Sequence, residues 1–239
     1  MGVGPAEITS LAAQLEAAVK KAEDVVSSVK FADKSRLQVY TIAYACACVE
    51  HSHALLLLIR GKAWISTWPV LRAVIEAMAY VDQLDADPKQ TLLDLQYGSL
   101  ESRNSWTEAA KQADYGPAYA SALPETNLKS EMTTLKNGGA KTDQMYERIK
   151  AVDVRIAKDF VVTNEEHTGR FIGMWKACSQ SAHMGGDKIL KLMCINNASE
   201  GVDVVPGRDP DIQILKEQVS ACIAALGLVS IRVDSLISS

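Results

Sequence analysis

The chain has 239 residues, of which 48% are hydrophobic and 23% are charged, so it can bury a sizeable core. Its net charge of −4 gives no general attraction to nucleic acid. The first residues, MGVGPAEITS, lack the charged start and apolar run of a signal peptide, and the five cysteines form no Cys-x-x-Cys pair. We therefore expect a soluble, cytoplasmic protein with reduced thiols.

Two long helices are predicted first. Residues 5–30 carry apolar side chains at helical spacing, and a second helix is expected from a cap at Asp33 to Arg60, where Gly61 ends it. Apolar and aromatic residues of this second helix recur in steps of three and four: Leu37, Tyr40, Tyr44, Cys48, His51, Leu55 and Leu58. This stripe predicts a seam that faces a helical bundle.

The next stretch, Ala63 to Val81, carries only two charges, Arg72 and Glu76, one helical turn apart. A helix that is apolar nearly all round is typical of a buried central helix, and Pro69 lies inside this helix or marks its start. Buried ions need polar partners. Because Arg before Glu is the weaker order for a pair four residues apart, we expect each side chain to find a partner on another helix.

The remaining elements complete an all-α fold. A fourth helix is expected from Pro88 to about Gln112, and residues 142–160 are helical with a break near 152–154. A helix capped by Asn164 runs to His183, and residues 188–205 form a small hairpin or an irregular excursion. A final helix covers about 209–236. We predict one domain, 1–239, with its core in 33–186 and about seven or eight helices.

A second group of polar side chains lies late in the chain. Lys176, Ser179 and His183 are spaced by three and four residues, which places them on one face of a helix. Histidine can act as acid or base near neutral pH, although a histidine near a helix C-terminus can equally be a capping cation. Small residues recur every four positions on this helix, which predicts close approach of a neighbour: Gly169, Gly173, Ala177 and Ser181.

Metal and cofactor signatures are weak. Glu50 and His53 form one Glu-x-x-His pattern, whereas helical di-metal proteins use two such patterns with further carboxylates. No phosphate-binding glycine-rich loop, Gly-x-Ser-x-Gly turn or basic recognition helix occurs. We expect no bound metal, no cofactor and no membrane span, and nucleic acid is not indicated as a partner.

The two polar groups resemble motifs of a bacterial all-α family of unknown function. In that family one helix reads Leu-Arg-x-x-x-Glu, and a late helix reads aromatic-x-x-x-Ser-x-x-x-His-Gly. The matching residues here are Leu71, Arg72 and Glu76, then Trp175, Ser179 and His183. The sequence departs from the family at Met184, which precedes Gly185 where the family has glycine directly. The resemblance, over about 35–186, implies that Arg72, Glu76, Ser179 and His183 converge.

A more distant likeness is to HEPN-type helical domains. Their ribonuclease members use an arginine followed by a histidine after four to six residues. No arginine of this chain precedes a histidine at that spacing, since Arg170 lies thirteen positions before His183. This departure counts against a ribonuclease of that kind.

Two functions follow as hypotheses. The first is a helical ligand-binding or interaction protein, which the resemblance places in stress or phage defence and in which Arg72, Lys176 and His183 bind a small anionic ligand. The alternative is an enzyme acting on a phosphodiester or another anionic substrate, with His183 as acid or base. A homodimer is compatible with the sequence, because bundles with apolar helices often pair, but the sequence does not decide the oligomeric state. The sequence does not decide whether the polar cluster is functional or structural, nor whether the protein is an enzyme.

Overall fold

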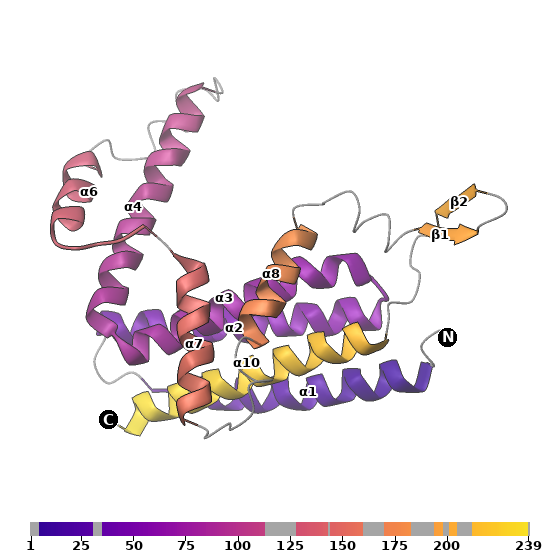
Figure 1. The fold of residues 1–239 in the computed structure, drawn as a ribbon. Coiled ribbons are helices and arrows are strands. Elements are labelled where there is room, and N and C mark those ends of the chain that lie inside the picture. The colour runs from indigo at the N-terminus through magenta and orange to yellow at the C-terminus, as the bar shows by residue number, and fades with distance from the viewer. Residues whose placement is uncertain are drawn as a thin grey trace. The chain divides into compact units, whose positions relative to one another are not determined.

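The described part of a computed structural model comprises residues 5–30, 35–112, 128–142, 144–159, 170–182, 194–197, 201–204 and 212–238. These residues form eight helices and one two-stranded hairpin, which confirms the predicted all-α multi-helix bundle (Figure 1). The chain divides into two compact units, one of residues 1–85 with 146–239 and one of residues 86–145. That 1–239 forms one domain stays a prediction.

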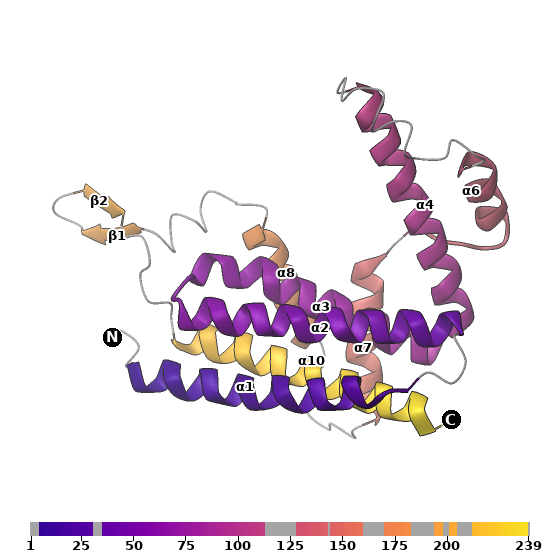
Figure 2. The same cartoon turned by 180° about the vertical axis from the view of Figure 1, so that it is seen from behind.

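Three long helices form the base of the first unit: α1 (Pro5–Ser28), α2 (Arg36–Arg60) and α10 (Ile212–Ser238). Each of them packs against the other two, as the parallel course of their ribbons in Figures 1 and 2 shows. Their shared core is aliphatic, with fully buried Leu15 on α1, Leu55 on α2 and Leu226 on α10. This burial of apolar stripes on three helices is the main source of stability for the unit.

Helix α2 differs from its prediction in the residue that caps its start and in the face that it buries. Ser35 is the N-cap, since its hydroxyl accepts a hydrogen bond from the Gln38 amide at 3.2 Å, whereas Asp33 lies outside the described residues. The inward face shares Cys48 and Leu55 with the predicted seam but is otherwise turned by about one position. Its buried residues include Thr41, Ala45, Cys48, Ser52, Leu55 and Ile59. Small side chains at its centre allow close contact with α10, where Cys222 Sγ donates to Ser52 Oγ at 3.2 Å.

Helix α3 (Trp64–Ala86) packs on α2 and α10. Pro69 lies inside the helix and does not mark its start. From Leu71 onward the helix is mostly buried, as predicted, but Ile65 and Pro69 in its first turns are exposed. The prediction of a buried central helix is therefore right for its second part, whereas its first turns bury only one side, with Trp64 and Thr67.

Two shorter helices cover α3: α7 (Met145–Asp159) and α8 (Arg170–Ala182). The predicted break near Val152 is wrong, because α7 is continuous. The predicted cap Asn164 lies outside the described residues. Instead, Asp153 of α7 accepts hydrogen bonds from the amides of Phe171 and Ile172 at 3.1 and 3.0 Å, and so caps the first turn of α8.

The hairpin pairs β1 (Cys194–Asn197) with β2 (Gly201–Val204) in antiparallel register, with Ile195 opposite Asp203. It follows His183 in the chain, as expected.

The second unit contains α4 (Pro88–Gln112), which begins as predicted, and α6 (Leu128–Asn137). These two helices pack together, and Asp94 accepts hydrogen bonds from Gln90 and from the Lys141 amide. Gly139, at φ +97°, supplies the left-handed residue in the turn after α6.

Two helices, α2 and α10, are long and apolar enough to cross a membrane, with mean hydropathy of 1.6 and 1.7. In the apolar 18-residue window of each helix, 39% and 50% of the residues are buried inside the bundle. Core helices of soluble proteins have the same length and composition. This observation is consistent with the predicted soluble protein, and the cytoplasmic location stays a prediction.

Candidate functional site

The contact between α3 and α8 is made by Arg72, Glu76 and Trp175. Glu76 Oε1 accepts two hydrogen bonds, one from Arg72 Nε at 2.7 Å and one from Trp175 Nε1 at 2.8 Å. The Arg72 guanidinium lies over the Trp175 ring at 5.4 Å from its centroid, within range of a cation–π contact. We call these three residues the Arg–Glu–Trp cluster. They bring the two motifs of the sequence analysis into contact, as predicted.

The partners within this cluster differ from those expected. Arg72 and Glu76 pair with each other along α3 in addition to meeting α8, although the order of their charges is the weaker one. Their side chains are 30% and 28% exposed, so the pair is part-buried and not sealed in the core. The indole Nε1–H of Trp175, a residue that entered only as the aromatic of a motif, supplies the contact between helices.

The other motif residues take separate positions. Lys176 Nζ lies 4.9 Å from the ring centroid of Tyr146 on α7 and does not contact Glu76. Ser179, one turn after Trp175 on the same face of α8, has a buried hydroxyl without a hydrogen-bond partner in the described part of the chain. His183 lies outside the described residues, so its convergence with Arg72 stays a prediction.

At Gly173 the predicted row of small residues on α8 does not mediate close packing, whereas Gly169 and the Ser181 side chain lie outside what the structure describes. Gly173 is exposed, and a Cβ atom built there would meet nothing within 4 Å. The helix is held instead by polar and aromatic contacts, including a hydrogen bond at 2.7 Å from Arg170 Nη2 to Ser220 Oγ of α10. Burial raises the pKa of the Asp153 carboxyl that caps α8, although its two amide hydrogen bonds lower it.

A further stack of aromatic and cationic side chains continues the surface along α3. Tyr80, one turn after Glu76, stacks on Tyr44 of α2 with ring centroids 4.4 Å apart. Arg148 of α7 lies over the Tyr80 ring at 5.2 Å. Three cation–π contacts therefore join α3, α7 and α8 around one side of the first unit.

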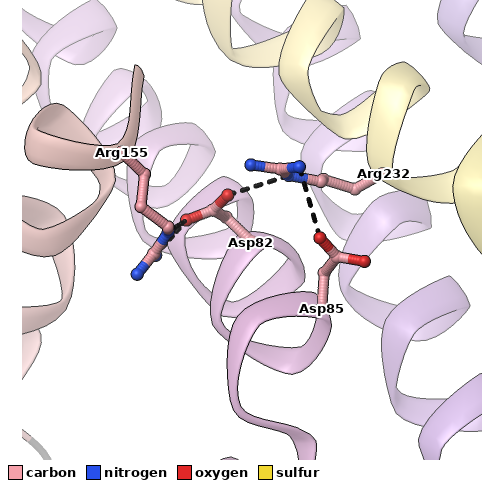
Figure 3. A network of polar contacts seen from close by, with 4 residues as sticks. All are labelled: Asp82, Asp85, Arg155 and Arg232. Atoms are coloured by element: carbon pink, nitrogen blue, oxygen red, sulfur yellow. Dashed lines mark hydrogen bonds and ion pairs between the residues drawn. The ribbon is translucent and has the colours of Figure 1, made fainter. Parts of the chain in front are cut away.

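Among the described residues, the most deeply buried charged side chain is that of Asp82, which lies just beyond the predicted central stretch Ala63 to Val81. Asp82 is 1% exposed and accepts from Arg155 of α7 through Nε and Nη2, and from Arg232 of α10 through Nε at 3.0 Å (Figure 3). Arg232 also pairs with Asp85 at 3.3 Å. The sequence carries a signal for this burial. Asp82 continues the helical spacing of Leu71, Ile75 and Met78, in steps of four, three and four, and so lies on the buried face of α3.

The weak metal pattern forms no cluster. His53 Nε2 lies 3.7 Å from Glu23 of α1, and both side chains are about half exposed. Within the described residues, no three His, Cys, Asp or Glu side chains gather as metal ligands would.

Replacing Glu76 by alanine tests the energetic role of the Arg–Glu–Trp cluster. The change removes the acceptor of both Arg72 Nε and Trp175 Nε1. Because these groups are part-exposed and water can replace the carboxylate, we expect a loss of about 1–2 kcal/mol of unfolding free energy, measured by urea denaturation. This is less than the roughly 3–5 kcal/mol that a fully buried pair would give. Glu76→Gln keeps one acceptor and should lose less; a Glu76→Ala variant as stable as the parent would contradict the prediction.

Comparisons with known proteins do not connect this chain to a family. A scan with protein-family models and searches of curated proteins and of solved structures each gave no match to this chain.

Proposed function

We propose that this protein is a helical binding module that takes a small anionic ligand at Arg72. The observation that supports this proposal most directly is the geometry of the guanidinium. Its Nε is held by Glu76 and one face lies on Trp175, while neither Nη1 nor Nη2 has a partner among the described residues. A guanidinium fixed in this way presents two donors side by side, the arrangement that suits phosphate or carboxylate.

The charge and burial of the neighbouring groups favour an anion. Glu76 engages only Nε of Arg72, so the rest of the guanidinium stays available to an anion. Lys176, next to Trp175 on α8, adds a second positive charge to this helix, although its Nζ lies over the Tyr146 ring and not against Glu76. The buried Ser179 hydroxyl on the same face of α8 as Trp175 adds a donor in need of an acceptor. Buried polar groups are nearly always satisfied, by protein, water or ligand, so this hydroxyl supports a ligand or an ordered water nearby.

Calorimetric titration with inorganic phosphate and pyrophosphate at low ionic strength tests the proposal. We expect binding that weakens at least about tenfold in Arg72→Ala, since a hydrogen bond to a charged group contributes about 1.5–3 kcal/mol. Arg72→Lys should also weaken binding, because lysine keeps the charge but loses the paired donors. The matched control is Arg60→Ala. Arg60 is an exposed arginine at the end of α2, and it pairs with Glu16 of α1. No binding of either anion, or equal binding by Arg72→Ala and Arg60→Ala, would contradict the proposal.

The alternative function, hydrolysis of a phosphodiester, would use the same anion site with His183 as acid or base. It is tested by the same preparations with bis(p-nitrophenyl) phosphate. Turnover that is lost in His183→Ala while pyrophosphate still binds would favour the enzyme over the binding module.

A further inference from the structure

The outward face of α2 carries exposed apolar side chains toward both of its ends, Val39 and Leu57. Six residues on this face recur in alternating steps of four and three, and all are exposed: Val39, Ala43, Cys46, Glu50, His53 and Leu57. We call them the α2 outer stripe. Val39 and Leu57 are 48% and 67% exposed, although the opposite side of α2 packs against α1 and α10. Figure 2 shows α2 along the near side of the first unit.

Helix α2 is more apolar than its burial within one chain requires. Its apolar window has a mean hydropathy of 1.6, yet only 39% of that window is buried. Apolar surface of this kind on a helix marks a contact with a bilayer or with protein. Glu50 and His53 lie near the middle of α2, where ionisable groups in a bilayer are costly, so the stripe favours a protein partner.

We propose that the α2 outer stripe binds the same stripe of a second copy of this chain, with the two helices antiparallel. A two-fold axis makes every contact occur twice, so the pairing must be self-complementary. We place the two helices in the register in which the residue numbers of facing positions add up to 103. Glu50 then lies opposite His53 of the second copy, and Cys46 lies opposite its Leu57. This register gives two equivalent carboxylate–imidazole pairs and two apolar pairs, with Ala43 leaving room for Arg60.

The side chains of one copy are already disposed for this pairing. His53 uses Nε2 toward Glu23 of its own chain, and Nδ1 has no partner within the described residues. Glu50 is exposed and likewise makes no ion pair within the described residues. Since a contact limited to two helices of about 37 Å is smaller than a standard interface, a weak, concentration-dependent dimer is expected.

Cysteine crosslinking tests both the dimer and its register. In a Cys194→Ser background, Leu57→Cys places a thiol opposite the native Cys46 of the second copy. Mild oxidation by copper–phenanthroline removes two electrons and two protons from the thiols and forms the disulfide. We expect several-fold more covalent dimer than from the background alone. Val154→Cys, on the 60% exposed Val154 of α7, gives the level of random collisions.

Sedimentation velocity supplies the second measurement, on the full chain at concentrations from micromolar to hundreds of micromolar. Leu57→Glu should shift the parent toward monomer, whereas Val154→Glu should not; both positions are exposed, so folding is retained. A parent that stays monomeric throughout would overturn the proposal, as would equal crosslinking of Leu57→Cys and Val154→Cys. A monomer that cosediments with lipid vesicles, and loses this binding in Leu57→Glu, would assign the stripe to a bilayer instead.

Discussion

Asp82→Ala is expected to lower the free energy of unfolding by about 3–5 kcal/mol, the largest effect of any single substitution considered for this chain. The carboxylate is 1% exposed and accepts from two arginines on two different helices (Figure 3). Its removal leaves two guanidinium groups, 25% and 17% exposed, without their shared counter-charge. Unpaired charge that is largely withdrawn from water is strongly unfavourable.

The neighbours of Asp82 moderate this loss. Arg232 keeps Asp85, and Gln83, with its amide oxygen turned toward Arg155, accepts hydrogen bonds from that side chain at 3.2 and 2.6 Å. We therefore expect the lower end of the range for Asp82→Ala, about 3 kcal/mol. Asp82→Asn keeps the shape but loses the charge, and should lie between the parent and Asp82→Ala.

Asp85→Ala is the matched control for this prediction. Asp85 lies on the same helix and pairs with the same Arg232, but its side chain is 33% exposed and it has one ion pair. A partly exposed pair of this kind contributes about 1 kcal/mol or less. Urea denaturation of the three variants at neutral pH provides the measurement. Equal losses from Asp82→Ala and Asp85→Ala would show that burial of the network does not determine its energy.

Some of this fold can be predicted from local sequence because the information is local. Helix α3 is recognised from its long apolar run, and α4 from Asp87-Pro88, where the Asp87 carboxylate accepts from the Gln90 amide at 3.2 Å. The contact between α3 and α8 was also predicted, since Arg72 and Glu76 in an apolar helix require polar partners. The choice of Trp175 as that partner was not predictable, because it depends on the rotation of α8 about its own axis.

Long-range partners could not be predicted from spacing. Cys48 and Leu55 of the predicted α2 seam are buried. The rest of the seam was placed one position away, because its large side chains suggested the inward face, whereas Ala45 and Ser52 lie inside. The fit of small residues against α10 determines which face of α2 is buried. In the same way, nothing local to Asp82 indicates that its partners are Arg155 and Arg232, which are 73 and 150 residues away.

The same fit of small residues has a consequence at alkaline pH, because it buries two thiols between α2, α3 and α10. Burial raises the pKa of Cys222 from 9.0 to about 12, although a hydrogen bond to Ser52 lowers it. Burial also raises the pKa of Cys48 well above 9.0, with a further contribution from Cys222. Both thiols therefore stay protonated in the folded protein over a range in which the unfolded chain ionises.

The sign of the effect follows from linkage. A thiol whose folded pKa exceeds its unfolded pKa contributes stability that is fully present below pH 9 and is lost as the pH rises toward 12. At pH 10 the loss attributable to Cys222 is about 1.4 kcal/mol, and the buried Cys48 thiol acts in the same direction. We expect the parent to unfold at clearly lower urea concentration at pH 10 than at pH 8, under reducing conditions.

Because lysines and tyrosines also titrate in this range, the informative quantity is the difference between variants. Cys222→Ala removes one titrating thiol, so its loss of stability between pH 8 and pH 10 should be smaller than that of the parent by about 1.4 kcal/mol. Cys46→Ala is the matched control; the pKa of Cys46 is raised by partial burial and by Glu50, but the thiol is exposed, so its removal should change the pH dependence less. If Cys222→Ala and the parent lose the same stability over this range, Cys222 is not held in the buried, protonated state that the packing of α2 against α10 requires.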